Sequence, residues 1–373
     1  MQSVSTFPGG STITEHPDLA ELCRRERVVT CYLDTEVTTE DAGHRAGIRW
    51  KDISRRLEGS GVGARTLEAM GAAVEDLRRL GPSLCVMASG PDVLLAEVGQ
   101  RALGRDFGCA GPLPVLGPLL EWRQHDVAYM TVACDRAGAD IAALGPGAAF
   151  TASSGDDDRH DPDLHKVPSG GWSQSRYQQR VENAWDRNAR ETVDLVERLA
   201  KQVQPRLVLY GGDPHACALV EEHAGAALRP LLQRVPLSRA ADGSQAHDMH
   251  EVHRAVETAV AADTARILAT SREMSAKGLG AMGPRRVLEA ITASQAQMLL
   301  VHEDGPDERR AYMSRDPLGL ALDRSTVEAF GGEVSEVPLA DAAILGALTS
   351  GASVRMVPRS AVPEGMAALL RFP

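Results

Sequence analysis

Residues 170–174 read Gly-Gly-Trp-Ser-Gln and hold the side chains best suited to chemistry in this chain. Two adjacent glycines adopt backbone angles that other residues avoid, so they predict a hinge. The glutamine at position 174 does not titrate, which suits it to orienting a water molecule rather than to moving a proton. We call these residues the Gly170–Gln174 segment and expect it to form a loop with a polar tip.

A long helix is predicted directly behind this segment, and its two faces differ in character. At about 100° per residue, one stripe roughly 80° wide collects four arginines and an asparagine, and the opposite side is apolar. The stripe comprises Arg176, Arg180, Asn183, Arg187 and Arg190, and the apolar side comprises Tyr177, Val181, Trp185, Ala189, Val196 and Leu199. The apolar side can pack on a domain, while the stripe, which we call the arginine ridge, offers guanidinium groups to an anion such as RNA. The alternative is a solvated face whose charge is offset by Glu182, Asp186 and Glu191.

Composition limits the classes of function. The chain has 373 residues, of which 43% are hydrophobic, so two or three domains with buried cores are expected. Its formal net charge is −11, which excludes bulk binding to nucleic acid, because such binding depends on lysine and arginine. Aromatic residues make up only 4%, which argues against a platform that stacks single-stranded bases. Contact with RNA must therefore be local.

The cysteines and the apolar runs indicate the compartment. Six cysteines are spread along the chain without a Cys-x-x-Cys pair, which predicts buried free thiols in a reducing environment. The first residues show no basic region followed by an apolar core, and no apolar run approaches the ~20 residues that span a bilayer. We expect a soluble, cytoplasmic protein without membrane contact.

The order of predicted elements indicates an α/β fold of three consecutive domains with mixed sheets, because strand–loop–helix order repeats along the chain. We expect an N-terminal α/β domain over residues 1–124 and a middle domain over residues 125–262 that carries the Gly170–Gln174 segment. A C-terminal αβα sandwich is expected over residues 263–373.

Several local elements can be predicted with their boundaries. Turn residues between apolar runs indicate β-hairpins over residues 84–98 and 127–144. Residues 111–120 are expected to be extended, and residues 145–171, which lack periodicity, are expected to form a long loop. A helix is expected over residues 248–276, with an interruption near Asp263.

One glycine pattern raises a rival enzyme hypothesis. Gly278–Gly283 matches G-x-G-x-x-G, and Glu303 follows the last glycine by 20 residues, as in a dinucleotide fingerprint. The fingerprint needs a strand directly before its first glycine, whereas Thr270–Lys277 is rich in helix formers. We therefore expect these glycines to end one helix and begin the next, with Pro284 in its first turn. A nucleotide-dependent enzyme that uses this loop is the alternative.

Two groups of potential metal ligands are weaker candidates. His247, His250 and His253 are spaced three apart and drift around a helix instead of converging on an ion. The acidic residues between positions 156 and 161 lack the spacing of a calcium-binding loop. We expect neither a metal nor a cofactor, and no G-x-S-x-G nucleophile elbow occurs.

The order of elements from Val127 onward resembles the middle and C-terminal domains of eukaryotic and archaeal class I peptide release factors and of Pelota. The likeness is greatest to the bacterial and archaeal release-factor-like family, which includes Balon-like hibernation factors. The segments that carry it are Tyr129–Leu144, Gly170–Leu199, Leu207–Asp213, Lys277–Val301 and Met366–Phe372.

The resemblance implies a role for the Gly170–Gln174 segment. In release factors a Gly-Gly-Gln tripeptide enters the peptidyl transferase centre, where its glutamine helps to place the water that hydrolyses the ester between peptide and tRNA. By this likeness the catalytic residues are Gly170, Gly171 and Gln174, and the RNA-binding residues are Trp172, Ser173, Arg176, Arg180, Arg187 and Arg190. Two residues separate Gly171 from Gln174, so two activities stay open. One is peptidyl-tRNA hydrolysis in ribosome rescue, and the other is occupation of idle ribosomes in stress hibernation.

The same resemblance implies the partners. They are the 70S ribosome, with its ribosomal RNA and tRNA, and a translational GTPase. Residues 1–124 show no codon-reading motif, which argues against ordinary stop-codon recognition.

Overall fold

The chain forms two compact units, residues 1–124 together with 262–373, and residues 125–261. The computed structural model describes residues 3–6, 12–15, 19, 22–35, 42–99, 103–135, 137–145, 148–155, 171–239, 245–302 and 309–372. The residues expected to form the first and third domains thus pack into one unit, which we call the terminal unit, and the other is the middle unit. Three separate domains stay a prediction, whereas the α/β fold class is confirmed, because each unit combines helices with sheets.

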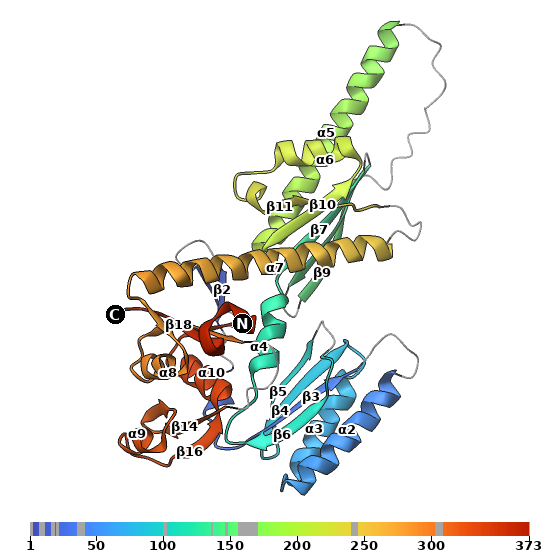
Figure 1. Cartoon of the computed structure of the whole chain (residues 1–373). Coiled ribbons are helices and arrows are strands. Elements are labelled where there is room, and N and C mark those ends of the chain that lie inside the picture. The colour runs from blue at the N-terminus through green and yellow to red at the C-terminus, as the bar shows by residue number, and fades with distance from the viewer. Residues whose placement is uncertain are drawn as a thin grey trace. The chain divides into compact units, whose positions relative to one another are not determined.

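The N-terminal part of the terminal unit is an antiparallel sheet with strand order β5-β4-β3-β6. Its strands are β3 (Val28–Asp34), β4 (Ser83–Ser89), β5 (Asp92–Gly99) and β6 (Phe107–Gly111), and helices α2 (Ala42–Gly59) and α3 (Ala64–Leu77) cover one face (Figure 1). The hairpin predicted over residues 84–98 is confirmed. Strands β1 (Ser3–Thr6) and β2 (Thr12–Glu15) pair with each other in antiparallel fashion.

Helix α4 (Gly117–His125) supplies the core on the second face of this sheet. The extended run predicted over residues 111–120 is therefore wrong from Gly117 onward. Leu119 is fully buried, and the Trp122 ring meets the Tyr32 ring edge-on, with 5.4 Å between their centroids. The sequence does not predict this helix because Pro118 is typical of a helix break. Proline is nevertheless tolerated in the first turn of a helix, where Pro118 lies.

The C-terminal part of the terminal unit surrounds a four-stranded sheet with order β12-β18-β13-β17. The strands are β12 (Gly280–Met282), β13 (Ala296–His302), β17 (Ser353–Val357) and β18 (Met366–Leu370), and the helices are α7 (Gln245–Ala276), α8 (Pro284–Thr292) and α10 (Leu339–Thr349). Along β13, Leu299 and Val301 belong to the core formed with α8 and α10. Met298 and Leu300 belong instead to a cluster with Ile267 of α7. This alternation is typical of a strand buried on both faces, with helices on either side of the sheet.

A small sheet of order β15-β14-β16 completes this part. It consists of β14 (Arg310–Arg315), β15 (Leu318–Ala321) and β16 (Ser335–Pro338), and α9 (Arg324–Glu328) packs beside it. The hairpin of β14 and β15 is not predicted by the sequence, because arginines at both ends of β14 interrupt its apolar pattern.

One core joins the two parts of the terminal unit. Tyr32 and Trp122 from the N-terminal part belong to the same buried cluster as Leu299 from the C-terminal part. The Gln124 side chain also covers the outer edge of β17. Its Nε2 donates to the Met356 carbonyl, and its Oε1 accepts a hydrogen bond from the Met356 N–H, each over 3.0 Å. A side-chain amide thus takes the place of a neighbouring strand.

The middle unit is built on a mixed sheet of order β11-β10-β7-β8-β9. The strands are β7 (Tyr129–Cys134), β8 (Gly138–Gly145), β9 (Ala148–Gly155), β10 (Leu207–Gly212) and β11 (Leu232–Arg234). Strand β10 runs parallel to both β7 and β11, while β7, β8 and β9 are antiparallel. Helices α5 (Gly171–Val203) and α6 (Pro214–His223) pack on one face, and the first part of α7 packs on the other. The hairpin predicted over residues 127–144 is confirmed.

Two predictions for these elements are wrong. The loop expected over residues 145–171 contains strand β9. The sequence does not predict this strand because its residues are mostly alanine and serine, which give no alternation of apolar and polar side chains. Residues 156–170 lie outside the described residues. Helix α7 is continuous at Asp263, whose fully buried side chain is 2.8 Å from Arg266 Nη2 and 3.7 Å from Arg355 Nη1. Two arginines offset the cost of burying this carboxylate, so the helix does not break there.

The cysteines agree with expectation. All six are free, and all but the half-buried Cys109 are buried. Among the described helices, none has an apolar stretch long enough to cross a membrane.

Two helical glycines test the packing of the terminal unit. A Cβ atom at Gly346 in α10 would lie 2.5 Å from Leu320 Cδ1 and 2.8 Å from Ile291 Cγ2, whereas one at Gly47 in α2 would meet nothing within 4 Å. Gly346→Ala should lower the free energy of unfolding by about 1–3 kcal/mol through overpacking. Gly47→Ala should raise it by about 0.5–1 kcal/mol, because alanine favours a helix interior. Urea denaturation measures both, and a stabilising Gly346→Ala would contradict the packing of α10.

Candidate functional site

Helix α5 begins inside the Gly170–Gln174 segment. Gly171 and Gln174 lie in its first turn, together with the tryptophan and serine between them, and Gly170 lies outside the described residues. The expectation of a loop that extends to Gln174 is therefore wrong. Tryptophan, serine and glutamine are all tolerated in helices, so nothing after the glycines prevents the helix from starting.

The length of α5 sets it apart from the other elements of the middle unit. Its 33 residues correspond to about 50 Å of helix. The strands beneath it have at most eight residues, or about 27 Å. The helix is thus about twice as long as the sheet that holds it, and its first turns extend past the strands (Figure 1).

The second half of α5 packs on the sheet through the face that its periodicity predicts. Ala189, Val193 and Val196 are buried in one cluster with the strands, and Trp185 and Leu199 are partly buried. The apolar face is confirmed for the residues whose side chains are described, which in α5 start at Trp185.

The described part of the arginine ridge lies on the exposed side of α5. Arg187 is exposed and has no ion pair or hydrogen bond with any residue that the structure describes. The Arg190 side chain is 64% exposed, and its Nη2 is 3.0 Å from Asp186 Oδ2. An exposed pair of this kind contributes little to stability, so Arg190 can exchange Asp186 for another anion at small cost. Arg176 and Arg180 lie earlier in α5.

Two side-chain contacts join α5 to α6. His223 Nε2 lies 2.6 Å from Asp186 Oδ1, and the rings of Trp185 and His215 meet edge to face at 5.1 Å. Because both contacts reach across from α6, they hold the rotation of α5 about its axis. The direction of the arginine ridge follows from that rotation.

The turn between β10 and α6 is crowded against the end of β7. Gly212 has φ of +124°, and a Cβ atom there would lie 1.9 Å from the Cys134 carbonyl oxygen, so only glycine fits. The next residue, Asp213, donates its N–H to the same carbonyl over 2.9 Å. Its Oδ1 accepts hydrogen bonds from the N–H groups of His215 at 2.8 Å and Ala216 at 3.3 Å, which caps α6.

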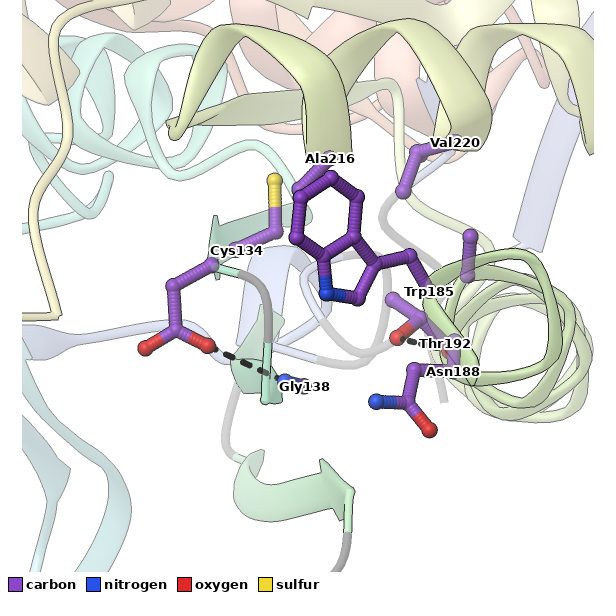
Figure 2. Close-up of a pocket in the computed structure, with 9 residues that line it drawn as sticks. Cys134, Gly138, Trp185, Asn188, Thr192, Ala216 and Val220 are labelled. Atoms are coloured by element: carbon purple, nitrogen blue, oxygen red, sulfur yellow. Dashed lines mark hydrogen bonds between the residues drawn. The ribbon is translucent and has the colours of Figure 1, made fainter. Parts of the chain in front are cut away.

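A small hollow lies where α5, α6 and the β7–β8 turn meet (Figure 2). It is lined by Cys134, Asp135, Gly138, Trp185, Asn188, Ala189, Thr192, Ala216 and Val220. Its enclosed space holds about one water molecule. A hollow of this size cannot take a small-molecule substrate, so the functional candidate in the middle unit is α5 itself.

The Gly278–Gly283 pattern lacks the geometry of a dinucleotide fingerprint. It follows α7 rather than a strand, and the short β12 within it pairs antiparallel with β18. Gly278 and Gly283 have φ of +77°, and Gly283 directly precedes α8, which starts at Pro284. The prediction that these glycines end one helix and begin the next is confirmed. The parallel βαβ unit that a dinucleotide site needs is not formed by these residues.

The potential metal ligands do not converge in the described residues. His250 and His253 are exposed on α7, and the acidic residues between 156 and 161 lie outside the described residues. No three His, Cys, Asp or Glu side chains gather around a common point in the part of the chain that the structure describes.

The sequence does not predict two side-chain contacts around α6. Asp186 of α5 contacts His223 of α6, and Cys134 of β7 contacts Cys217 of α6. Both join segments far apart in the sequence. They depend on the parallel pairing of β7 with β10, which places the start of α6 beside the end of β7. Neither segment alone carries a signal of that pairing.

The middle of the chain is similar to one known protein family. Residues 128–277 match the profile of bacterial archaeo-eukaryotic release factor family 2. The match includes α5, the whole sheet of the middle unit and α7. No match is found among curated proteins.

Solved structures with similarity to the chain include three from archaea and yeast. Pelota from Archaeoglobus fulgidus is 12% identical, with 100% of this chain and 99% of that chain covered and a TM-score of 0.36. An archaeal translation termination factor is 16% identical, with 95% and 96% covered and a TM-score of 0.25. S. cerevisiae Dom34, a translation termination-like factor, is 9% identical, with 100% and 97% covered and a TM-score of 0.35.

Proposed function

Because residues 128–277 are a release-factor-like segment, we propose that this chain is a ribosome-associated factor that brings the Gly170–Gln174 segment to the peptidyl transferase centre. The family match carries the proposal, since it contains all of α5 and the sheet on which α5 packs. A site enclosed by ribosomal RNA must be reached by a projecting element. The length of α5 relative to its sheet supports that role.

The distribution of charge supports a single defined docking site. The chain carries a net charge of −11, so its overall charge disfavours general binding to RNA. Arg187 and Arg190 nevertheless stand exposed on one side of α5. A local cationic element on an acidic protein favours one site of matching shape over general binding to phosphates. The partners that we propose are the 70S ribosome, with its ribosomal RNA and tRNA, and a translational GTPase.

Two activities are compatible with this placement. In ribosome rescue, Gln174 orients a water molecule while the ribosomal RNA supplies the electrostatic environment for ester hydrolysis. In stress hibernation, the same segment occupies the centre of an idle ribosome and performs no chemistry. The spacing Gly-Gly-Trp-Ser-Gln differs from the release-factor tripeptide by two inserted residues, so peptide release has to be measured directly.

Reversing the described ridge arginines tests ribosome binding. We expect the double variant Arg187→Glu, Arg190→Glu to co-sediment with 70S ribosomes at least about tenfold more weakly at physiological salt. The physical reason is the loss of phosphate contacts and the repulsion that two new carboxylates add.

The matched control is the double variant Arg254→Glu, Arg272→Glu on α7, which makes the same change of charge. In each double variant both arginines are exposed and one forms an intrahelical ion pair, Arg190 with Asp186 or Arg254 with Glu251. The control should sediment like the wild type. Equal sedimentation of the two double variants would contradict the assignment of the ridge to RNA.

Replacing the glutamine separates rescue from hibernation. If the factor hydrolyses peptidyl-tRNA, Gln174→Ala should slow peptide release from stalled ribosomes by about 100-fold while binding is unchanged, because the attacking water is no longer placed. Gln178→Ala, one turn further along α5, is the control and should release peptide normally. Wild-type protein that sediments with ribosomes but releases no peptide would rule out rescue and leave hibernation.

A further inference from the structure

Cys134 and Cys217 bring two buried sulfur atoms into contact beneath α5. Cys134 ends β7, Cys217 lies in the first half of α6, and their Sγ atoms are 3.5 Å apart. Their exposed fractions are 2% and 0%. No other two cysteines among the described residues have sulfur atoms joined by a hydrogen bond. Such proximity brings the thiols within reach of disulfide formation after a small shift.

The surroundings of the pair favour loss of one proton. The hydrogen bond between the two sulfur atoms lowers the pKa of Cys217 against the effect of burial, which raises it, and the nearby Arg234 guanidinium lowers it further. The same hydrogen bond, together with burial, raises the pKa of Cys134. Cys217 also lies close to the start of α6, where the helix dipole favours a thiolate. The proton can pass between the sulfurs along their hydrogen bond, so the pair acts as one acidic group.

Cys134 gives the pair access to a small oxidant. Its side chain lines the hollow that holds about one water molecule, beside the Trp185 ring and Ala216 (Figure 2). Hydrogen peroxide is only slightly larger than water. Most thiol reagents are far larger, so the hollow selects by size.

We propose that Cys134 and Cys217 are a dithiol that hydrogen peroxide oxidises to a disulfide between β7 and α6. In the first step the Cys217 thiolate takes the proton of the Cys134 thiol along their hydrogen bond as the Cys134 sulfur attacks one oxygen of the peroxide. The S–O bond forms, the O–O bond breaks, and the leaving hydroxide takes up the proton that Cys217 had released, which yields water.

In the second step the Cys217 sulfur attacks the Cys134 sulfur. The S–S bond forms, the S–O bond breaks, and the departing hydroxide takes the remaining thiol proton to form a second water. Two thiols are thereby oxidised to one disulfide, and one peroxide is reduced to two waters. The new bond links the end of β7 covalently to α6, the helix that contacts α5.

Peptide mapping of the folded full-length protein tests this modification. The protein is treated with hydrogen peroxide, blocked with N-ethylmaleimide in denaturant, digested and analysed by mass spectrometry. We expect a disulfide-linked pair of peptides that contain Cys134 and Cys217 and that separate on reduction with dithiothreitol. Cys109 is the internal control, because it is the most exposed of the cysteines and burial still raises its pKa to about 11. Oxidation of Cys109 before the pair, or two blocked thiols at Cys134 and Cys217, would overturn the proposal.

Single substitutions test the order of the two steps. In Cys217→Ser, oxidation should stop at a sulfenic acid on Cys134 that dimedone captures. In Cys134→Ser, Cys217 should remain a thiol, because the residue that lines the hollow is gone. Dimedone capture at Cys217 in that variant would contradict the order. The measurements use no ribosomes, so their outcome is independent of the proposed function.

Discussion

The burial of three small side chains in the second half of α5 decides where the helix points. Ala189, Val193 and Val196 lie in one cluster with the strands of the middle unit. A fully buried valine contributes about 1.5–3 kcal/mol relative to an exposed one, which is enough to hold one helix face against the sheet. Because an α-helix is stiff over this length, the direction fixed at the base extends to the first turn, where Gly171 and Gln174 lie.

The β10–α6 turn and the end of β7, next to α5, hold a required glycine, a helix cap and a pair of cysteines. Gly212 has to be glycine because the Cys134 carbonyl is too close for a side chain, and Asp213 caps α6 beside it. The close approach of the β10–α6 turn to β7 also brings Cys217 beside Cys134. The support of α5 and the thiol chemistry therefore share one cause, which is the parallel pairing of β7 with β10.

Periodicity predicts the parts of this fold that bury large apolar side chains in a regular pattern. The hairpins at residues 84–98 and 127–144 and the apolar face of α5 belong to this class. Strand β9 has mostly small side chains, and α4 begins with glycine and proline, so neither shows a pattern to detect. The continuity of α7 at Asp263 depends on Arg355, which lies 92 residues away and cannot be assigned as a partner from sequence.

Part of the candidate site can likewise be predicted from the sequence, and part cannot. The Gly170–Gln174 segment and the arginine ridge can be identified from residue types and spacing alone. The contacts that orient them, such as Asp186 with His223, depend on tertiary pairing and become visible only in the structure.

The most direct test of the central claim is a photocrosslink from the first turn of α5. Benzoylphenylalanine in place of Trp172, on protein bound to 70S ribosomes, should crosslink under ultraviolet light to the large-subunit RNA of the peptidyl transferase centre. The same photocrosslinker in place of Met249, which is 45% exposed on α7, serves as the control and should leave that RNA unlabelled. Crosslinks from position 172 that miss the peptidyl transferase centre, in protein that still sediments with ribosomes, would contradict the placement of the Gly170–Gln174 segment.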